Sequence, residues 1–127
     1  MGVKVEAISF KGQDERGMTT EIGNLDRNGP YILAYRFKGY SSGNHYHKGL
    51  SPLKDPEVVF LLTGKAELEH GKVAEGRVLE RKTLTVEAPA RIEIAAFTWH
   101  KLTFLEDACF VELNSFAEGD KDTFRLY

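Results

Sequence analysis

Two histidines and a glutamate lie in the middle of the sequence at spacings that proton transfer or metal binding can use. His45 and His47 are two residues apart, and side chains two apart on an extended strand point to the same face. Glu57 follows ten residues after His47 and opens an apolar, β-branched run that continues to Thr63 and ends at Gly64. This composition predicts a strand that carries one carboxylate at its start.

The pattern that runs from Gly39 through the two histidines to Glu57 resembles the first sequence motif of the cupins. The resemblance implies a small β-barrel in which His45, His47 and Glu57 bind a metal from neighbouring strands. It also implies a fourth ligand, a histidine just after a later strand, and His100 occupies that place. The resemblance therefore gives these three residues and His100 as the metal ligands.

Three imidazoles and one carboxylate suit a borderline divalent metal, and the sequence leaves Zn, Fe, Mn, Ni and Cu open. With iron such a site activates oxygen, as in a metal-dependent dioxygenase. With zinc it polarises a carbonyl group or lowers the pKa of bound water. Residues 48–56 separate the second histidine from the glutamate, and we expect this lengthened loop at the mouth of the site.

A second, narrower resemblance favours metal-free chemistry at the same two histidines. Segments 31–37, 43–48 and 116–124 are similar to the small cupins of sugar-nucleotide and surface-polysaccharide biosynthesis. That group includes nucleotide-linked ketosugar isomerases, in which the histidines at the places of His45 and His47 act as acid and base. Imidazole titrates near neutrality, so both chemistries stay open. A barrel that binds a small ligand without turning it over is the non-enzymatic alternative.

A sugar nucleotide would need cations for its phosphates and flat side chains for its rings. A planar guanidinium binds phosphate oxygens in pairs, and aromatic rings stack on sugars and bases. The candidates for these two roles are Arg16, Arg36 and Lys48 for the phosphates and Tyr35, Phe37, Phe60 and Phe97 for the rings.

Short strand-like segments, separated by glycine, proline and polar turns, run through the whole chain. No long segment has a helical period. A hairpin turn is expected at residues 70–72, where His70 would be solvated. The pattern predicts an all-β chain, one domain over residues 1–127 with the cupin-type jelly-roll β-barrel. The strands are expected over residues 3–10, 31–37, 57–63, 78–86, 92–97, 102–104 and 109–113.

The overall composition bounds the partners of the protein. Seventeen basic and nineteen acidic residues leave a net charge of −2, which excludes the basic surface typical of nucleic-acid-binding proteins. The single cysteine, Cys109, is predicted to be a buried thiol and agrees with a reducing cytoplasm. The N-terminus lacks the apolar core of a signal peptide, and no apolar run is long enough to span a membrane.

We therefore expect a cytoplasmic protein that binds a small molecule and has neither a nucleic-acid nor a membrane partner. The strand predicted over residues 3–10 carries charged side chains and reads as an edge strand. Its unpaired backbone groups would be open to a second copy of the chain. A homodimer is the expected assembly.

Overall fold

The computed structural model describes residues 2–23 and 25–126, and it consists mainly of antiparallel strands. Its two short helical pieces are η1 (Pro52–Lys54) and α1 (Phe116–Lys121). The strands are β1 (Val3–Ala7), β2 (Gly12–Asp14), β3 (Gly17–Thr19), β4 (Ile32–Arg36), β5 (Ser41–His45), β6 (Glu57–Thr63), β7 (Lys65–Ala74), β8 (Arg77–Glu87), β9 (Ala90–Ile94), β10 (Thr98–Phe104) and β11 (Ala108–Glu112).

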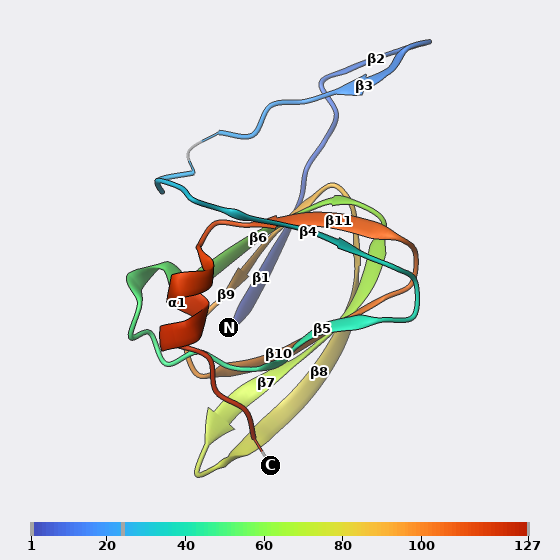
Figure 1. The fold of residues 1–127 in the computed structure, drawn as a ribbon. Helices are drawn as coiled ribbons and strands as arrows, with labels where there is room; N and C mark the ends of the chain where they lie inside the picture. The colour runs from blue at the N-terminus through green and yellow to red at the C-terminus, as the bar shows by residue number, and fades with distance from the viewer. Residues whose placement is uncertain (1, 24, 127) are drawn as a thin grey trace.

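Two sheets face one another and form the body of the molecule (Figure 1). One sheet has the strand order β1-β9-β6-β11-β4, and the other has the order β5-β10-β7-β8. This arrangement confirms the all-β class and the jelly roll. The predicted closed barrel is corrected to an open one, because among the described residues the edge strands of one sheet do not pair with those of the other.

The main core lies between the two sheets, because alternate residues of each strand point inward. Leu61, Leu68 and Phe104 are fully buried there. The ring of Phe104 stacks on the ring of Phe110, with 5.8 Å between the centroids and an angle of 3° between the planes. Burial of large apolar side chains of this kind contributes roughly 1.5–3 kcal/mol each. The same strands carry polar residues further along, so this packing also fixes the position of the site.

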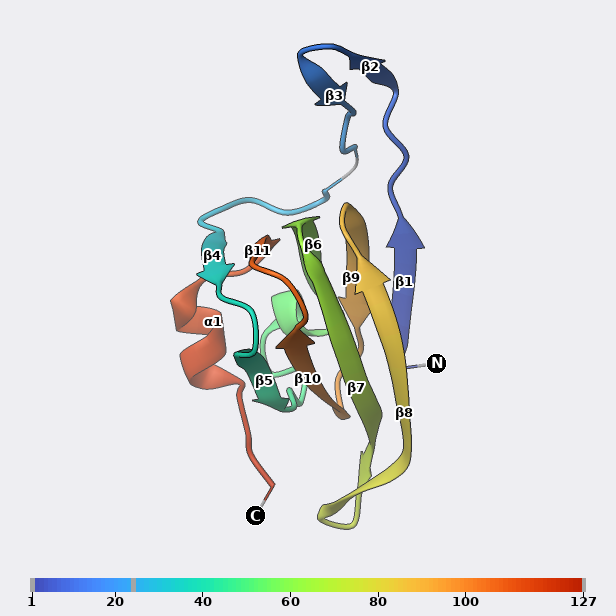
Figure 2. The same ribbon diagram turned by 90° about the vertical axis from the view of Figure 1, so that its right-hand side faces the viewer.

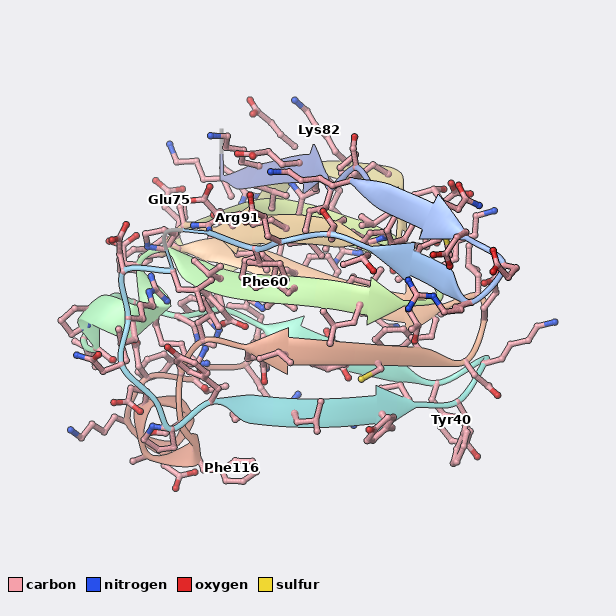
Figure 3. All side chains as sticks on the ribbon, turned by 90° about the horizontal axis from the view of Figure 1, so that it is seen from above. Tyr40, Phe60, Glu75, Lys82, Arg91 and Phe116 are labelled. Atoms are coloured by element: carbon pink, nitrogen blue, oxygen red, sulfur yellow. The ribbon has the colours of Figure 1, made fainter. Side chains whose placement is uncertain are left out.

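A second, smaller apolar cluster lies on the outer face of the five-stranded sheet. It contains Val58, Phe60 and Leu113. Figure 3 views this face from above and shows Phe60 beside Arg91, whose guanidinium carbon lies 5.6 Å from the ring centroid. Phe60, which the sequence analysis offered for ligand stacking, is therefore covered by the protein itself.

The hairpin of β2 and β3 stands away from both sheets (Figures 1 and 2). Arg16 lies at its turn and is paired with the carboxylate of Asp14 at 2.8 Å. This position separates Arg16 from the histidines, so the structure does not support it as a phosphate ligand at their site. β1 forms one edge of the five-stranded sheet, as the sequence predicts.

The hairpin turn expected at residues 70–72 lies further along the chain. β7 continues to Ala74, and the turn is made by Glu75 and Gly76, which both have positive φ angles. Gly71 serves close packing instead, since a Cβ there would lie 2.5 Å from the side chain of Val78. His70 is therefore a half-buried strand residue and not a solvated turn residue.

The chain ends with a short helix that the sequence pattern did not reveal. α1 has six residues, too few for a helical period to be recognised. Its first turn is closed where the backbone N–H of Ser115 donates to the Glu118 carboxylate at 3.1 Å. Neither helical piece in the described chain has the length and apolar composition needed to cross a membrane.

Candidate functional site

The three histidines of the predicted site lie together at one end of the space between the sheets. His45 ends β5 and pairs in register with His100 on β10. His47 follows β5, and its ring centroid lies 4.9 Å from that of His45 and 5.3 Å from that of His100. One possible ligand atom from each ring lies within 4.8 Å of the others. The structure therefore brings together residues 55 positions apart in the chain.

A strained backbone segment before His45 allows this approach. Gly43 and Asn44 have φ angles of 91° and 61°, in the left-handed region that favours glycine. A Cβ at Gly43 would lie 2.8 Å from the carbonyl oxygen of His100, so only glycine lets the two strands come this close. Asn44 is held in its conformation because its side-chain oxygen accepts a hydrogen bond from Trp99 Nε1 at 3.1 Å.

His47 is fixed from both sides and is 1% exposed. Its Nδ1 donates to the carbonyl oxygen of Asp122 at 2.6 Å, since a carbonyl oxygen can only accept. Its Nε2 contacts a carboxylate oxygen of Glu57. The ring is therefore locked in one orientation, with the second nitrogen directed at Glu57.

Glu57 opens β6, as predicted, and its side chain is buried beside an unexpected cation. The Nζ of Lys54 lies 3.3 Å from the Glu57 carboxylate, and Lys54 is 4% exposed. Burial alone would raise the pKa of Glu57. The contact with His47 and the positive charge of Lys54 outweigh burial, and they hold the pKa of Glu57 well below its ordinary value. Glu57 is therefore a carboxylate that already has a counter-ion within the protein.

The other two imidazoles are neutral near neutral pH. Burial, together with the neighbouring rings of His100 and His47, lowers the pKa of His45 to about 3. Burial also lowers the pKa of His100, whose Nδ1 donates to the carbonyl oxygen of Thr98 at 3.0 Å. A neutral imidazole has a free lone pair, which is what both a metal ligand and a general base require.

A second carboxyl group of the site belongs to Glu112, a half-buried residue at the end of β11. Burial, followed by the charge of Glu57 and a hydrogen bond with it, raises the pKa of Glu112 to about 8. Two carboxyl groups this close do not both ionise readily, so the pair holds one proton near neutral pH. The site therefore contains a carboxylic acid that can donate a proton.

A cavity of about 480 Å³ opens beside these groups. This volume lies in the range of small-molecule sites. His47 does not line it, and its ring is buried. The titratable residues along its wall are His45, Glu57, His100, Glu112 and two arginines, Arg36 and Arg125.

The three histidines fit a divalent metal, whereas Glu57 is engaged elsewhere. Their donor atoms lie within 4.8 Å of one another, and the buried Nδ1 of His45 has no hydrogen-bond partner among the described residues. The Glu57 carboxylate contacts His47 and Lys54. A metal at this place would be held by three histidines once the Nε2 of His47 had left Glu57, and the predicted fourth ligand would first have to leave Lys54.

Of the predicted substrate-binding residues, Arg36 lines the cavity and Tyr35 does not. The two are neighbours on β4, so their side chains point to opposite faces. Tyr35 is 69% exposed on the outer side of the sheet, and Phe37, on the same face, is 71% exposed. Tyr35, predicted to stack on a ligand, therefore does not face this cavity.

Lys48 and Phe97 also lie away from the cavity. Lys48 packs on the ring of Phe124, with its Nζ 4.1 Å from the centroid. Phe97 lines a separate pocket of about 410 Å³ together with His70 and Lys82. Of these two predicted substrate-binding residues, Lys48 is therefore engaged by an aromatic ring, and Phe97 occupies a turn before β10.

Four residues of the site were missed by sequence reasoning. Glu112 had a recognisable signal, because it ends an apolar strand at an inward-facing position, as Glu57 begins one. Lys54 lies in the lengthened loop, whose function the spacing left open. The other two, Asp122 and Arg125, belong to the C-terminal segment, where no pattern indicated contact with the histidines.

Comparison with known proteins finds solved structures with a similar fold. No family model and no curated protein matches the sequence. A double mutant of the QdtA 3,4-ketoisomerase from Thermoanaerobacterium thermosaccharolyticum, in complex with TDP, is 24% identical with a TM-score of 0.70, covering 99% of this chain and 88% of that one.

Two epimerases are similar in the same way. RmlC from Legionella pneumophila, a dTDP-6-deoxy-D-glucose-3,5-epimerase in complex with dTDP-4-keto-L-rhamnose, is 16% identical with a TM-score of 0.67, covering 99% of this chain and 68% of that one. The 3'-monoepimerase ChmJ from Streptomyces bikiniensis, in complex with dTDP-quinovose, is 15% identical with a TM-score of 0.68, covering 88% and 63%. At these identities the likeness shows the fold alone, a double-sheet jelly roll.

Proposed function

We propose that the protein is an isomerase or epimerase of nucleotide-linked keto sugars that uses His45 for proton transfer without a metal. The observation that carries this proposal is the position of His45, a neutral imidazole on the wall of a cavity of about 480 Å³. The substrate class is supported by the similarity in fold to enzymes solved with TDP and with dTDP-linked sugars.

In the proposed reaction His45 removes a proton from the carbon next to the sugar carbonyl. The carboxylic acid of Glu112 gives its proton to the carbonyl oxygen, and the electron pair of the broken C–H bond forms the double bond of an enediol. The imidazolium of His45 then returns its proton to the former carbonyl carbon, while the other hydroxyl gives its proton back to Glu112. Atoms and charges balance over the cycle, and the carbonyl group has moved by one carbon.

The low pKa of His45 is compatible with this role as a base. Burial and two neighbouring imidazoles disfavour the imidazolium in the free protein. Negative charge that develops on the sugar during proton removal, 3–4 Å away in a reactive complex, would favour the charged form. General acid–base catalysis of this kind contributes roughly 10²–10⁴-fold.

His47, the other half of the predicted acid–base pair, has a different role in this proposal. It does not line the cavity; its Nδ1 donates to the carbonyl oxygen of Asp122, and its Nε2 contacts Glu57. We assign it to positioning: its ring supports that of His45 at 4.9 Å and its Nε2 holds the Glu57 carboxylate. The charge of Glu57 in turn keeps a proton on Glu112.

A metal-dependent reaction is the second candidate, and the cluster of three imidazoles favours it. An ion held by His45, His47 and His100 would supply Lewis-acid polarisation of a sugar carbonyl. The sequence leaves its identity open among Zn, Fe, Mn, Ni and Cu.

Turnover of nucleotide-linked keto sugars by protein freed of metal separates these candidates. The purified protein is dialysed against a chelator, its metal content is measured by elemental analysis, and product is followed by NMR. We expect product at the same rate before and after dialysis. Turnover that requires a stoichiometric metal, lost in His100→Ala, would replace this proposal by the second candidate. Binding of TDP without any product would leave a non-catalytic ligand-binding barrel.

We further propose that two copies of the chain associate. Among the described residues no strand pairs with the outer edge of β1 in the five-stranded sheet, and Leu33 and Tyr35 on β4 expose apolar surface at the opposite side of that sheet. Sedimentation at micromolar concentration should give twice the chain mass. A monomer under these conditions would remove the proposal.

A further inference from the structure

We infer that the C-terminal tail after α1 is a wall of the ligand site, and that Arg125 on this tail binds the phosphate groups of the ligand together with Arg36 on β4. The identity of the ligand as a nucleoside diphosphate rests on the proposed function. The anion site itself rests on the geometry of residues 122–125 and of the cavity.

The tail is anchored to the segment that carries the histidines. The carboxylate of Asp122, which is fully buried, accepts hydrogen bonds from the backbone N–H groups of Lys48 at 2.7 Å and Ser51 at 3.1 Å. Two residues later, Phe124 and Tyr46 exchange a pair of backbone hydrogen bonds, each 2.9 Å long. One short antiparallel bridge therefore joins the tail to the residue that follows His45.

This anchoring carries Arg125 to the cavity. Its Nη1 lies 3.3 Å from the carbonyl oxygen of Asn44, the residue directly before His45. The side chain lines the cavity and is exposed to solvent. A guanidinium has five N–H donors, so one such bond leaves most of them for a ligand.

Arg36 reaches the same cavity from the other sheet and is held more firmly. Its Nε donates to Ser42 Oγ at 2.7 Å, its Nη1 donates to the carbonyl oxygen of Tyr35 at 2.9 Å, and its guanidinium carbon lies 5.4 Å from the ring centroid of Phe110. These contacts orient the planar group before a ligand arrives, which lowers the entropy cost of binding.

The charges along the cavity favour an anion with more than one negative charge. The ion-pair partner of Glu57 is Lys54, and within the described residues no ion pair joins either arginine to a carboxylate. Two guanidinium groups along one cavity are therefore left without a counter-ion. Phosphate oxygens accept hydrogen bonds in pairs from guanidinium groups, and a diphosphate supplies enough negative charge for both.

Calorimetric titration of the full chain with three probes tests the inference. The probes are TDP, thymidine and inorganic pyrophosphate, and the variants are Arg36→Gln and Arg125→Gln. Lys121→Gln is the matched control, because it removes one positive charge from the same C-terminal segment outside the cavity. Arg125→Lys keeps the charge and removes the planar donor pair. Thermal unfolding of each variant shows that it is folded.

We expect TDP binding to weaken about 10- to 100-fold in Arg36→Gln and in Arg125→Gln, with an intermediate loss in Arg125→Lys and none in Lys121→Gln. Thymidine binding should be unchanged in all four variants. Unchanged TDP affinity in folded Arg125→Gln, or no binding of TDP and pyrophosphate to the wild type, would overturn the inference. Turnover of keto sugars unaffected by Arg125→Gln would also overturn it and leave the proposed function standing. Arginine-dependent binding of pyrophosphate without binding of TDP would support the anion site and count against the proposed function.

Discussion

The two ends of the space between the sheets are built on the same strands and have opposite chemistry. At one end the inward-facing residues are apolar and closely packed, and the rings of Phe104 and Phe110 stack. At the other end the same alternation directs titratable side chains inward. The contrast is visible within single strands: Leu61 and Glu57 on β6, Phe104 and His100 on β10, and Ala108 and Glu112 on β11.

This difference shows how the fold divides stability from chemistry. The apolar end stabilises the fold because it buries apolar surface. The polar end places carboxyl and imidazole groups in the interior, which lowers the free energy of unfolding. That cost is visible at His45, whose Nδ1 is buried without a hydrogen-bond partner among the described residues. Functional sites often lower stability in this way, because their residues are placed for a ligand rather than for packing.

The largest effect on activity should come from His45→Gln, at the polar end. Removing the base should lower the turnover of nucleotide-linked keto sugars by about 10²–10⁴-fold. The free energy of unfolding in urea should stay the same or rise, since the imidazole that carries the buried Nδ1 without a partner is lost. His70→Gln, a half-buried histidine of the other pocket, is the control and should keep full turnover. A large loss of stability in His45→Gln would contradict the division of stability and chemistry between the two ends.

The largest effect on stability should come from Phe104→Ala, at the apolar end. Phe104 is 1% exposed, and its truncation should lower the free energy of unfolding by about 3–5 kcal/mol. Phe116→Ala is the matched control, because Phe116 is 75% exposed and should change stability by no more than about 0.5 kcal/mol. Urea unfolding of the two variants measures the difference. Equal losses in both would show that the packed end does not dominate stability.

Alternation of side chains explains why the apolar end and the histidines could be predicted from the sequence. Strand patterns indicated β6 and the all-β class, and the cupin motif indicated that His45, His47, Glu57 and His100 are neighbours. These features can be recognised in short stretches of the sequence, from runs of a few residues or from a spaced motif. The structure brings the three histidines together and places Glu57 against His47.

The remaining parts of the site depend on contacts between distant segments. Asp122 reaches His47 across 75 positions, and Arg125 reaches Asn44 across 81. No local pattern encodes such contacts. The position of Tyr35 illustrates a related limit: alternation shows that Tyr35 and Arg36 point to opposite faces, but it does not show that the cavity lies on the face of Arg36. Lys54 was overlooked because a lysine in a loop is ordinarily solvated, whereas here a buried carboxylate holds it.

The smallest effect, and the one that sharpens the comparison most, is the pH dependence of stability at the polar end. The pKa of His45 is about 3 in the folded protein, below its ordinary value of 6.5. Between these values the unfolded chain binds more protons, so the free energy of unfolding falls as the pH is lowered below 6.5, by at most about 1.4 kcal/mol per pH unit. Glu112 has the opposite sign: its folded pKa of about 8 lies above 4.5, so stability falls as the pH is raised between them.

These opposite signs can be separated by substitution. Relative to wild type, His45→Gln should gain stability as the pH falls from about 6.5 to about 5, because its acid-sensitive group is gone. Glu112→Gln should gain stability as the pH rises from about 5 to about 8, because no buried carboxyl then has to ionise. Urea unfolding of the three proteins near pH 5, 6.5 and 8 measures both differences. If the free energy of unfolding of either variant depends on pH as that of the wild type does, the burial of that group does not affect the stability of the polar end.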